Sequence, residues 1–149
     1  MNWWHKNAEP IESFAAVVTA VVAIAALFGA KVQIDRSDLI QRQQSARDAY
    51  RAHLAIAATQ PQFSRPTDAC SLVQSADGGA YVAYVDHLLY SAEQMLAVEN
   101  GWSATFLEKL VPHTDYLCSA FTPDIPIGVE VSNLMEEFRA ENCPISSTC

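Results

Sequence analysis

The most constraining feature of this sequence is a run of 18 residues, 13–30, that contains no charged side chain. As an α-helix with a rise of about 1.5 Å per residue, the run would span roughly 27 Å, close to the ~30 Å hydrocarbon core of a bilayer. Ile11 and residues 32–34 lengthen the apolar stretch. We therefore expect a transmembrane helix over residues 11–34.

The residues that flank the run have the chemistry of a membrane interface. The indole rings of Trp3 and Trp4 favour the headgroup level, and the stems of Lys31 and Arg36 can carry their charges out to it. A cleaved signal peptide would need a basic start, but residues 1–12 hold one lysine and two glutamates. A core helix of so small a soluble domain is rarely apolar on all sides. An uncleaved single-pass span explains the run better than either alternative.

The distribution of positive charges predicts the orientation of the span. Lys and Arg side chains near the ends of a span favour the cytoplasmic side of the membrane. Only Lys6 precedes the span, whereas five basic residues follow it closely: Lys31, Arg36, Arg42, Arg47 and Arg51. We expect an extracytoplasmic N-terminus, residues 1–10, and a cytoplasmic C-terminal domain.

Beyond the span, apolar residues recur at helical spacing and no segment alternates as a half-buried strand would. The pattern predicts an all-α fold: a juxtamembrane helix over 35–60 that continues the membrane span, an acidic helical domain over 61–141, and an irregular tail over 142–149. Within the domain we expect a loop at 61–78, then helices at 80–99, from Ser103 onward with a break at Pro112, and at 127–141 after a turn at 122–126. Asn100 and Gly101 should end the helix over 80–99 in a left-handed conformation, and Ser103 should cap the next helix.

Each predicted helix carries an apolar stripe that we assign to the core. The stripes are Leu39, Ile40, Gln43, Ala46, Tyr50, His53, Leu54 and Ala57; Tyr81, Val85, Leu88, Leu89, Ala92 and Leu96; Leu107, Leu110, Val111, Leu117, Cys118 and Phe121; and Ile127, Val131, Leu134, Met135 and Phe138. Tyr84 and Tyr90 fall beside the second stripe, which makes them candidates to face a partner.

The charge balance excludes one large class of partner. The formal net charge is −8, with 9 Lys and Arg against 17 Asp and Glu, whereas nucleic acids are bound by clustered cations. Residues 31–60 hold five basic and three acidic side chains, and residues 61–149 hold three basic and twelve acidic ones. The simplest interpretation of both is a solvated surface, although a basic helix can also lie near anionic headgroups. We expect no nucleic-acid binding.

The sequence lacks the motifs that usually mark an active site or a metal site. Cys-x-x-Cys, His-Glu-x-x-His, Gly-x-Ser-x-Gly and the glycine-rich phosphate loops do not occur, and the four histidines show no paired spacing. We expect no enzyme activity, no cofactor and no metal.

The four cysteines admit more than one interpretation. Cys118 lies on an apolar stripe and is expected to be a small core side chain. Cys143 and Cys149 lie in the tail, where we expect no role, the alternatives being a metal-binding pair and a disulfide. In an oxidising compartment the even count of four, which includes Cys70, would instead indicate two disulfides.

The membrane run also holds small residues spaced four apart, which lets a second helix approach closely. The pairs are Ala16 with Ala20, Ala25 with Gly29, and Ala26 with Ala30. Seven of the 18 residues are alanine, so chance produces such pairs as readily as helix packing does. We treat the six residues as candidate packing positions toward other integral membrane proteins within the lipid bilayer.

The order of these features resembles that of small bacterial single-pass membrane proteins of uncharacterised function. The resemblance rests on an Ala/Val-rich span after Trp3, the Gln-x-Asp-Arg exit at 33–36, the Ala-Arg-Asp-Ala-Tyr segment at 46–50, and a Tyr-rich helix followed by Trp102. It covers most of residues 1–121 and implies a protein of the bacterial inner membrane with a cytoplasmic helical domain. It implies no activity, cofactor or catalytic residue.

Together these features favour an accessory or stabilising subunit of a larger bacterial membrane complex, which could be respiratory or photosynthetic. The alternative is a self-associating membrane-anchored scaffold or sensor, with the helix over 35–60 forming the contact between copies. A third interpretation is a metal- or redox-responsive protein that uses Cys143 and Cys149.

Overall fold

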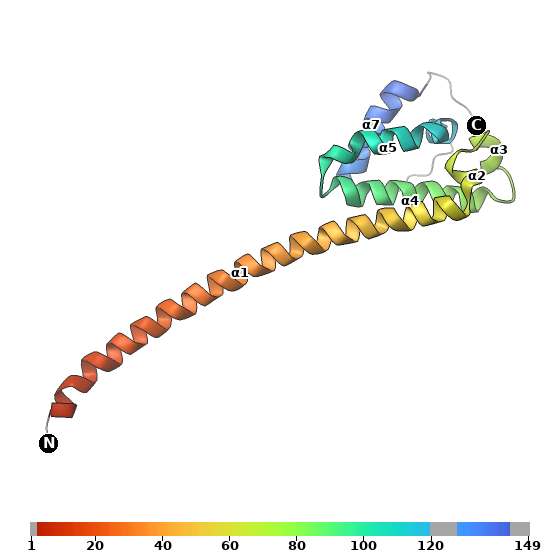
Figure 1. Ribbon diagram of the computed structural model, residues 1–149. Coiled ribbons are helices and arrows are strands. Elements are labelled where there is room, and N and C mark those ends of the chain that lie inside the picture. The colour runs from red at the N-terminus through yellow and green to blue at the C-terminus, as the bar shows by residue number, and fades with distance from the viewer. Residues whose placement is uncertain (1–2, 120–127, 144–149) are drawn as a thin grey trace. The chain divides into compact units, whose positions relative to one another are not determined.

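The computed structural model describes residues 3–119 and 128–143. Every secondary-structure element in these residues is a helix, so the predicted all-α fold is confirmed (Figure 1). The chain divides into two compact units, residues 1–41 and 42–149. The predicted turn at 122–126 and the tail beyond Cys143 lie outside the described residues, as do Phe121 and Ile127 of the predicted stripes.

The helix α1 spans Trp3–Thr59 and contributes residues to both units. The prediction that the apolar segment and the helix over 35–60 form one continuous helix is therefore confirmed. The helix ends where Pro61 disfavours helical geometry for the residue before it, and the Thr59 hydroxyl donates back to the carbonyl of Ile56 at 3.0 Å. Residues 42–59 of α1 belong to the second unit and pack against its other helices.

The predicted loop over 61–78 is wrong in part, because two short helices form within it. These are α2 (Pro61–Ser64) and α3 (Ala69–Val73). Pro61 stands in the first turn of α2, where its missing N–H costs nothing. Asp68 caps α3, accepting hydrogen bonds from the Ser71 backbone N–H at 2.9 Å and the Ser71 hydroxyl at 2.6 Å.

The helix α4 spans Gly78–Leu96 and packs against α3, α5 and α7 (Figure 1). Its first residue is a glycine, and a side chain at this position would collide with the carbonyl group of Val73. All six predicted core residues of this helix are buried. Its end differs from the prediction: residues 100–102 form the 3₁₀-helix η1 (Asn100–Trp102), and Gly101 does not adopt a left-handed conformation.

The predicted break at Pro112 is confirmed. The helix α5 (Ser103–Leu110) is followed by the 3₁₀-helix η2 (Val111–His113) and then by α6 (Thr114–Leu117). The 3₁₀ turn forms at Pro112 because proline cannot donate the backbone hydrogen bond that a continuous helix needs. Ser103 is the first residue of α5, not its cap: Trp102 occupies the cap position and makes no side-chain hydrogen bond there.

The helix α7 spans Val129–Asn142 and buries Val131, Leu134, Met135 and Phe138, as predicted. Its N-terminus is capped from α4, because the carboxylate of Glu93 accepts a hydrogen bond from the Val131 backbone N–H at 2.9 Å. A side chain at Gly128 would overlap that carboxylate. The contact explains why a glycine precedes the helix.

Four residues assigned to apolar stripes are exposed instead: Leu39, Ile40, Leu54 and Val111. Leu39 and Ile40 precede the second unit, and the described chain places nothing over them. Tyr84 was predicted to face a partner, but it is buried, because α4 packs on more than one side. Tyr90 is exposed, as expected.

Candidate functional site

The apolar part of α1 is exposed around its whole circumference. Every described side chain from Ala16 to Gln41 is exposed, including large apolar ones such as Leu27 at 71% and Phe28 at 69%. Within the described residues, the helix over Ala16–Thr59 is long and apolar enough to cross a membrane. Apolar surface costs about 25 cal/mol per Å² when it is left in water. Residues 16–34 therefore have a surface suited to lipid or to another apolar helix.

The structure places the six candidate packing residues on different sides of this helix. Nine residues make about two and a half turns, so Ala16 lies opposite Ala25, and Ala20 lies opposite Gly29. All six residues are exposed, and a methyl group added at Gly29 would meet nothing within 4 Å. The three pairs therefore lie on separate sides of the helix: Ala16 with Ala20, Ala25 with Gly29, and Ala26 with Ala30.

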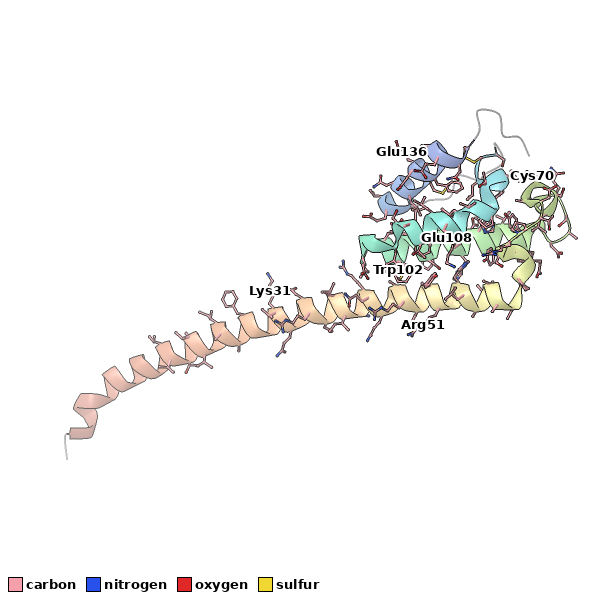
Figure 2. All side chains as sticks on the ribbon, turned by 45° about the horizontal axis from the view of Figure 1, so that its top comes forward. Lys31, Arg51, Cys70, Trp102, Glu108 and Glu136 are labelled. Atoms are coloured by element: carbon pink, nitrogen blue, oxygen red, sulfur yellow. A yellow bond between two sulfur atoms is a disulfide. The ribbon has the colours of Figure 1, made fainter. Side chains whose placement is uncertain are left out.

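The four predicted interface residues are only partly described. Lys31 and Arg36 are exposed, and Lys31 projects from the helix in Figure 2. Trp3 and Trp4 belong to the first turn of α1, but their side chains lie outside the described part of the chain. Whether these four residues lie at a membrane surface stays a prediction.

The second unit contains a buried cluster of histidine and tyrosine rings. His53 of α1 is 2% exposed, and its ring lies 4.9 Å from the Tyr84 ring and 5.8 Å from the His87 ring, both on α4. Burial, together with the charges of His87 and Lys109, lowers the pKa of His53 from 6.5 to about 4. The imidazole of His53 is therefore neutral at pH 7.

A second ring pair lies beside the first. The Tyr81 hydroxyl and Nδ1 of His113 are hydrogen-bonded at 2.9 Å, and both residues are almost completely buried. Burial lowers the pKa of His113 to about 4, with a smaller effect from His53, and it raises the pKa of Tyr81. The two residues thus form a hydrogen bond between uncharged groups in the core. This hydrogen bond joins α4 to η2.

This cluster has the properties of a packed polar core. Its rings pack against one another, with Phe63 contacting both Tyr81 and Tyr84. Burial lowers the pKa values of His53 and His113 and raises those of Tyr81 and Tyr84. Among the described residues, no group of three or more His, Cys, Asp or Glu side chains has an arrangement that could hold a metal ion.

A pocket of about 420 Å³ opens beside this cluster. Its lining comes from residues of α1, α2, α4, α5 and η2, together with the residue after α2: Tyr50, Ala57, Ser64, Arg65, Tyr84, Leu88, Thr105, Glu108, Lys109 and Pro112. The volume lies within the range of about 300–1,000 Å³ that is usual for small-molecule sites. The pocket brings together aromatic and charged side chains of the second unit.

Three charged side chains line this pocket without a charged partner. The described chain contains one ion pair, Arg51 with Asp48, and the charged groups of Arg65, Glu108 and Lys109 make no hydrogen bond or ion pair within it. Lys109 places its ammonium 5.9 Å from the centre of the Tyr50 ring. The Arg51 side chain points to solvent (Figure 2). The centres of the Trp102 and Tyr50 rings lie 5.4 Å apart.

Disulfides change the interpretation of the cysteines. Cys118 and Cys143 are joined, with their Cα atoms 5.4 Å apart, and Cys70 is also disulfide-bonded. The expectations that Cys118 is a simple core side chain and that Cys143 has no role are therefore wrong. The physical reason is that the ends of α6 and α7 meet, so two residues separated by 25 positions become neighbours. Cys149 lies outside the described residues.

The sequence did not single out the pocket or the ring cluster. His53 and His87 are 34 positions apart in the sequence, and spacing within one helix carries no information about contacts between helices. One usable signal was present, since Tyr50, His53 and Ala57 share one helical face, and its two rings are polar. A polar stripe on a face assigned to the core indicates either a buried network or a site.

Comparison with known proteins yields no relative for this chain. No protein-family model matches it, and neither does any curated protein or solved structure.

Proposed function

We propose that this chain is a non-catalytic accessory or stabilising subunit of a larger bacterial membrane complex. The observation that supports the proposal most strongly is the apolar surface of α1, which no described part of the chain covers. Lipid alone is enough to cover the apolar surface of a single transmembrane helix. The small residues on separate sides of the helix also allow a second transmembrane helix to approach closely.

One pair of small residues offers the closest approach. Gly29 is the only glycine between residues 11 and 34, and Ala25 lies one turn before it. Helix packing in a membrane is driven by van der Waals contact, since lipid is as apolar as the helices themselves. A partner helix can approach the backbone most closely at Gly29. We assign the contact to the Ala25–Gly29 side.

The alternative is a self-associating scaffold or sensor. In that case the same side of α1 would pack against a second copy of the chain, or residues 35–60 would do so. Exposed apolar residues at Leu39 and Ile40, which follow the predicted span, are the observation that favours this alternative. A homo-oligomer without other proteins would support it.

Two features of the chain favour opposite locations for the second unit. The five basic residues after the span favour the cytoplasm, whereas disulfides at Cys70 and between Cys118 and Cys143 favour an oxidising compartment. Long domains cross membranes largely regardless of their charge, while thiols in the cytosol are kept reduced. We propose that the second unit lies on the extracytoplasmic side of an inner membrane.

Purification from the native membrane in mild detergent tests the subunit proposal. We expect a set of integral membrane proteins at constant stoichiometry, identified by mass spectrometry. The double substitution Ala25→Ile with Gly29→Ile should reduce their recovery. The matched control, Ala16→Ile with Ala20→Ile, changes the opposite side and should leave it intact. Recovery of the chain alone as a homo-oligomer would overturn the subunit proposal in favour of the scaffold.

Cysteine labelling in intact cells tests the location. A variant with Ser at the four native cysteine positions and a single new cysteine, Ser132→Cys on the exposed surface of α7, is treated with a membrane-impermeant maleimide. Labelling before cell lysis is expected for an extracytoplasmic unit. Labelling only after lysis would instead support the orientation predicted from the basic residues.

A further inference from the structure

The pocket of the second unit gathers most of the basic side chains of residues 61–149. Residues 61–149 contain three basic side chains, Arg65, Lys109 and Arg139, and two of them line this one pocket. The same residues contain twelve acidic side chains, of which only Glu108 lines it. The pocket therefore carries a formal charge of +1 within an acidic domain. An even spread of charge would have given the opposite sign.

The two cations have no carboxylate partner within the described chain. Surface Arg and Lys side chains in an acidic domain would find acidic neighbours easily, yet Arg65 and Lys109 form no ion pair there. Lys109 is half-buried and lies over the Tyr50 ring. Its charge also reaches the buried His53 ring and lowers the pKa of that ring. Such charges are available to an anion that enters the pocket.

The remaining lining suits a flat apolar body. Tyr50 and Tyr84 contribute aromatic rings, and Leu88 and Pro112 add aliphatic surface. Tyr84 is held in place by contacts with His53 at 4.9 Å and with His113 at 5.8 Å. A rigid aromatic wall next to cations is a common arrangement for binding small ligands, because polar groups orient the ligand and apolar groups supply contact area.

We propose that this pocket binds a small organic oxyanion, a carboxylate or phosphate group carried on a flat apolar body. Arg65 and Lys109 hold the anionic group through charge-assisted hydrogen bonds. Tyr50 and Tyr84 contact the body. The proposal is independent of the subunit role, since a ligand site in the second unit requires no partner for α1.

The full chain in detergent micelles, titrated by calorimetry, tests this site with simple probes. Benzoate and phenyl phosphate represent the two anionic groups, benzyl alcohol is the neutral analogue, and inorganic phosphate lacks the apolar body. Saturable binding of either aromatic anion is expected, at least tenfold tighter than that of benzyl alcohol and of inorganic phosphate. The preferred probe distinguishes a carboxylate ligand from a phosphate ligand. No saturable binding of either aromatic anion would overturn the proposal.

Three substitutions give a test by sign. Lys109→Met should weaken binding of the preferred probe about tenfold or more, whereas Glu108→Gln should tighten it, because a repulsive charge is removed. Arg139→Gln is the matched control, since it removes the third cation of residues 61–149, which lies outside the pocket. Weaker binding in Glu108→Gln, or an equal loss in Arg139→Gln, would overturn the proposal. Unchanged thermal unfolding verifies that each variant is folded.

Discussion

The two units of this chain differ in the exposure of their apolar side chains. In residues 16–41 every side chain is exposed, although most of the first half of this segment is apolar. In residues 42–143 most of the described apolar and aromatic side chains gather in one core that contains Tyr81, Phe106 and Phe138. Apolar surface is unfavourable in water in both units. In the second unit the chain covers this surface itself, whereas no described part of the chain covers the apolar residues of the first unit.

Loss of a core ring should have the largest effect on the second unit. Phe106 is completely buried, contacts the Tyr50 ring edge-on and contacts the Trp102 ring in a tilted arrangement. Phe106→Ala should lower the free energy of unfolding by about 3–5 kcal/mol, measured by urea unfolding followed by circular dichroism. The control Leu54→Ala removes an exposed side chain and should change stability little. The membrane-bound fraction of Phe106→Ala should stay unchanged, which separates the two units.

Acid should destabilise the second unit through its buried histidines. The pKa values of His53 and His113 are lowered from 6.5 to about 4 by burial, so between these values the unfolded chain binds more protons than the folded one. The contribution of the neutral histidines to the free energy of unfolding is fully present above pH 6.5. It is lost as the pH drops toward 4, by up to about 3 kcal/mol for each histidine. Tyr84, His87, Lys109 and Tyr81 are the groups that face these two rings.

Urea unfolding at several pH values measures this slope. In a variant with His53→Gln and His113→Gln, the loss of stability between pH 6.5 and 4 should be much smaller. The double variant is also expected to start from a lower stability, because the hydrogen bond between Tyr81 and His113 is altered. A wild-type slope that persists in the variant would show that other groups titrate, and would contradict the prediction.

A charge in the first unit should act on membrane insertion alone. Ile24 lies near the centre of the expected span and is 54% exposed. Ile24→Lys should disfavour insertion by about 2.5–3.5 kcal/mol and shift protein from the membrane fraction to the soluble or degraded fraction. Leu54→Lys places the same charge on the second unit and should leave the distribution unchanged. Equal membrane fractions for both variants would remove the basis for a membrane span.

The sequence predicted those features that depend on one helix at a time. The stripes of α4 and α7 and the break at Pro112 follow from helical periodicity and from the missing donor of proline, which are local properties. Leu39 and Ile40 fit the same periodicity, yet they are exposed, because periodicity cannot say whether a partner element exists. The prediction that Tyr84 faces a partner was wrong for the opposite reason, since α4 has neighbours on more than one side.

The candidate site was beyond such reasoning. The pocket combines residues 50–57 with residues up to Pro112, and the bonded cysteines are 25 positions apart. These juxtapositions depend on how the helices fold back on one another, which one sequence does not specify locally. The charge count could have helped: only three basic residues occur beyond residue 60. Their rarity made each of them worth placing.

Removal of the disulfide should affect the second unit and leave the first unchanged. The bond between Cys118 and Cys143 closes a loop with a sequence separation of 25, so its loss should cost about 3–4 kcal/mol by the loop-entropy argument. Cys118→Ser with Cys143→Ser, measured by thermal unfolding, should show this loss. Treatment of the wild type with a reducing agent should lower its stability, while the double variant should retain only the response that arises from Cys70. Identical responses of both proteins would mean that the bond contributes nothing.

The smallest expected effect concerns the cap that joins α4 to α7. Glu93 accepts a hydrogen bond from the Val131 N–H at 2.9 Å, where the positive end of the α7 dipole also favours a carboxylate. Glu93→Gln keeps an acceptor oxygen but removes the charge, so stability should fall by about 0.5–1 kcal/mol. Glu136→Gln, an exposed change further along α7 (Figure 2), is the matched control and should have almost no effect. A loss in both variants would attribute the effect to overall charge. A loss confined to Glu93 would show that a contact between two helices stabilises the N-terminus of α7. No described part of the chain covers residues 16–34 of α1, which are exposed throughout.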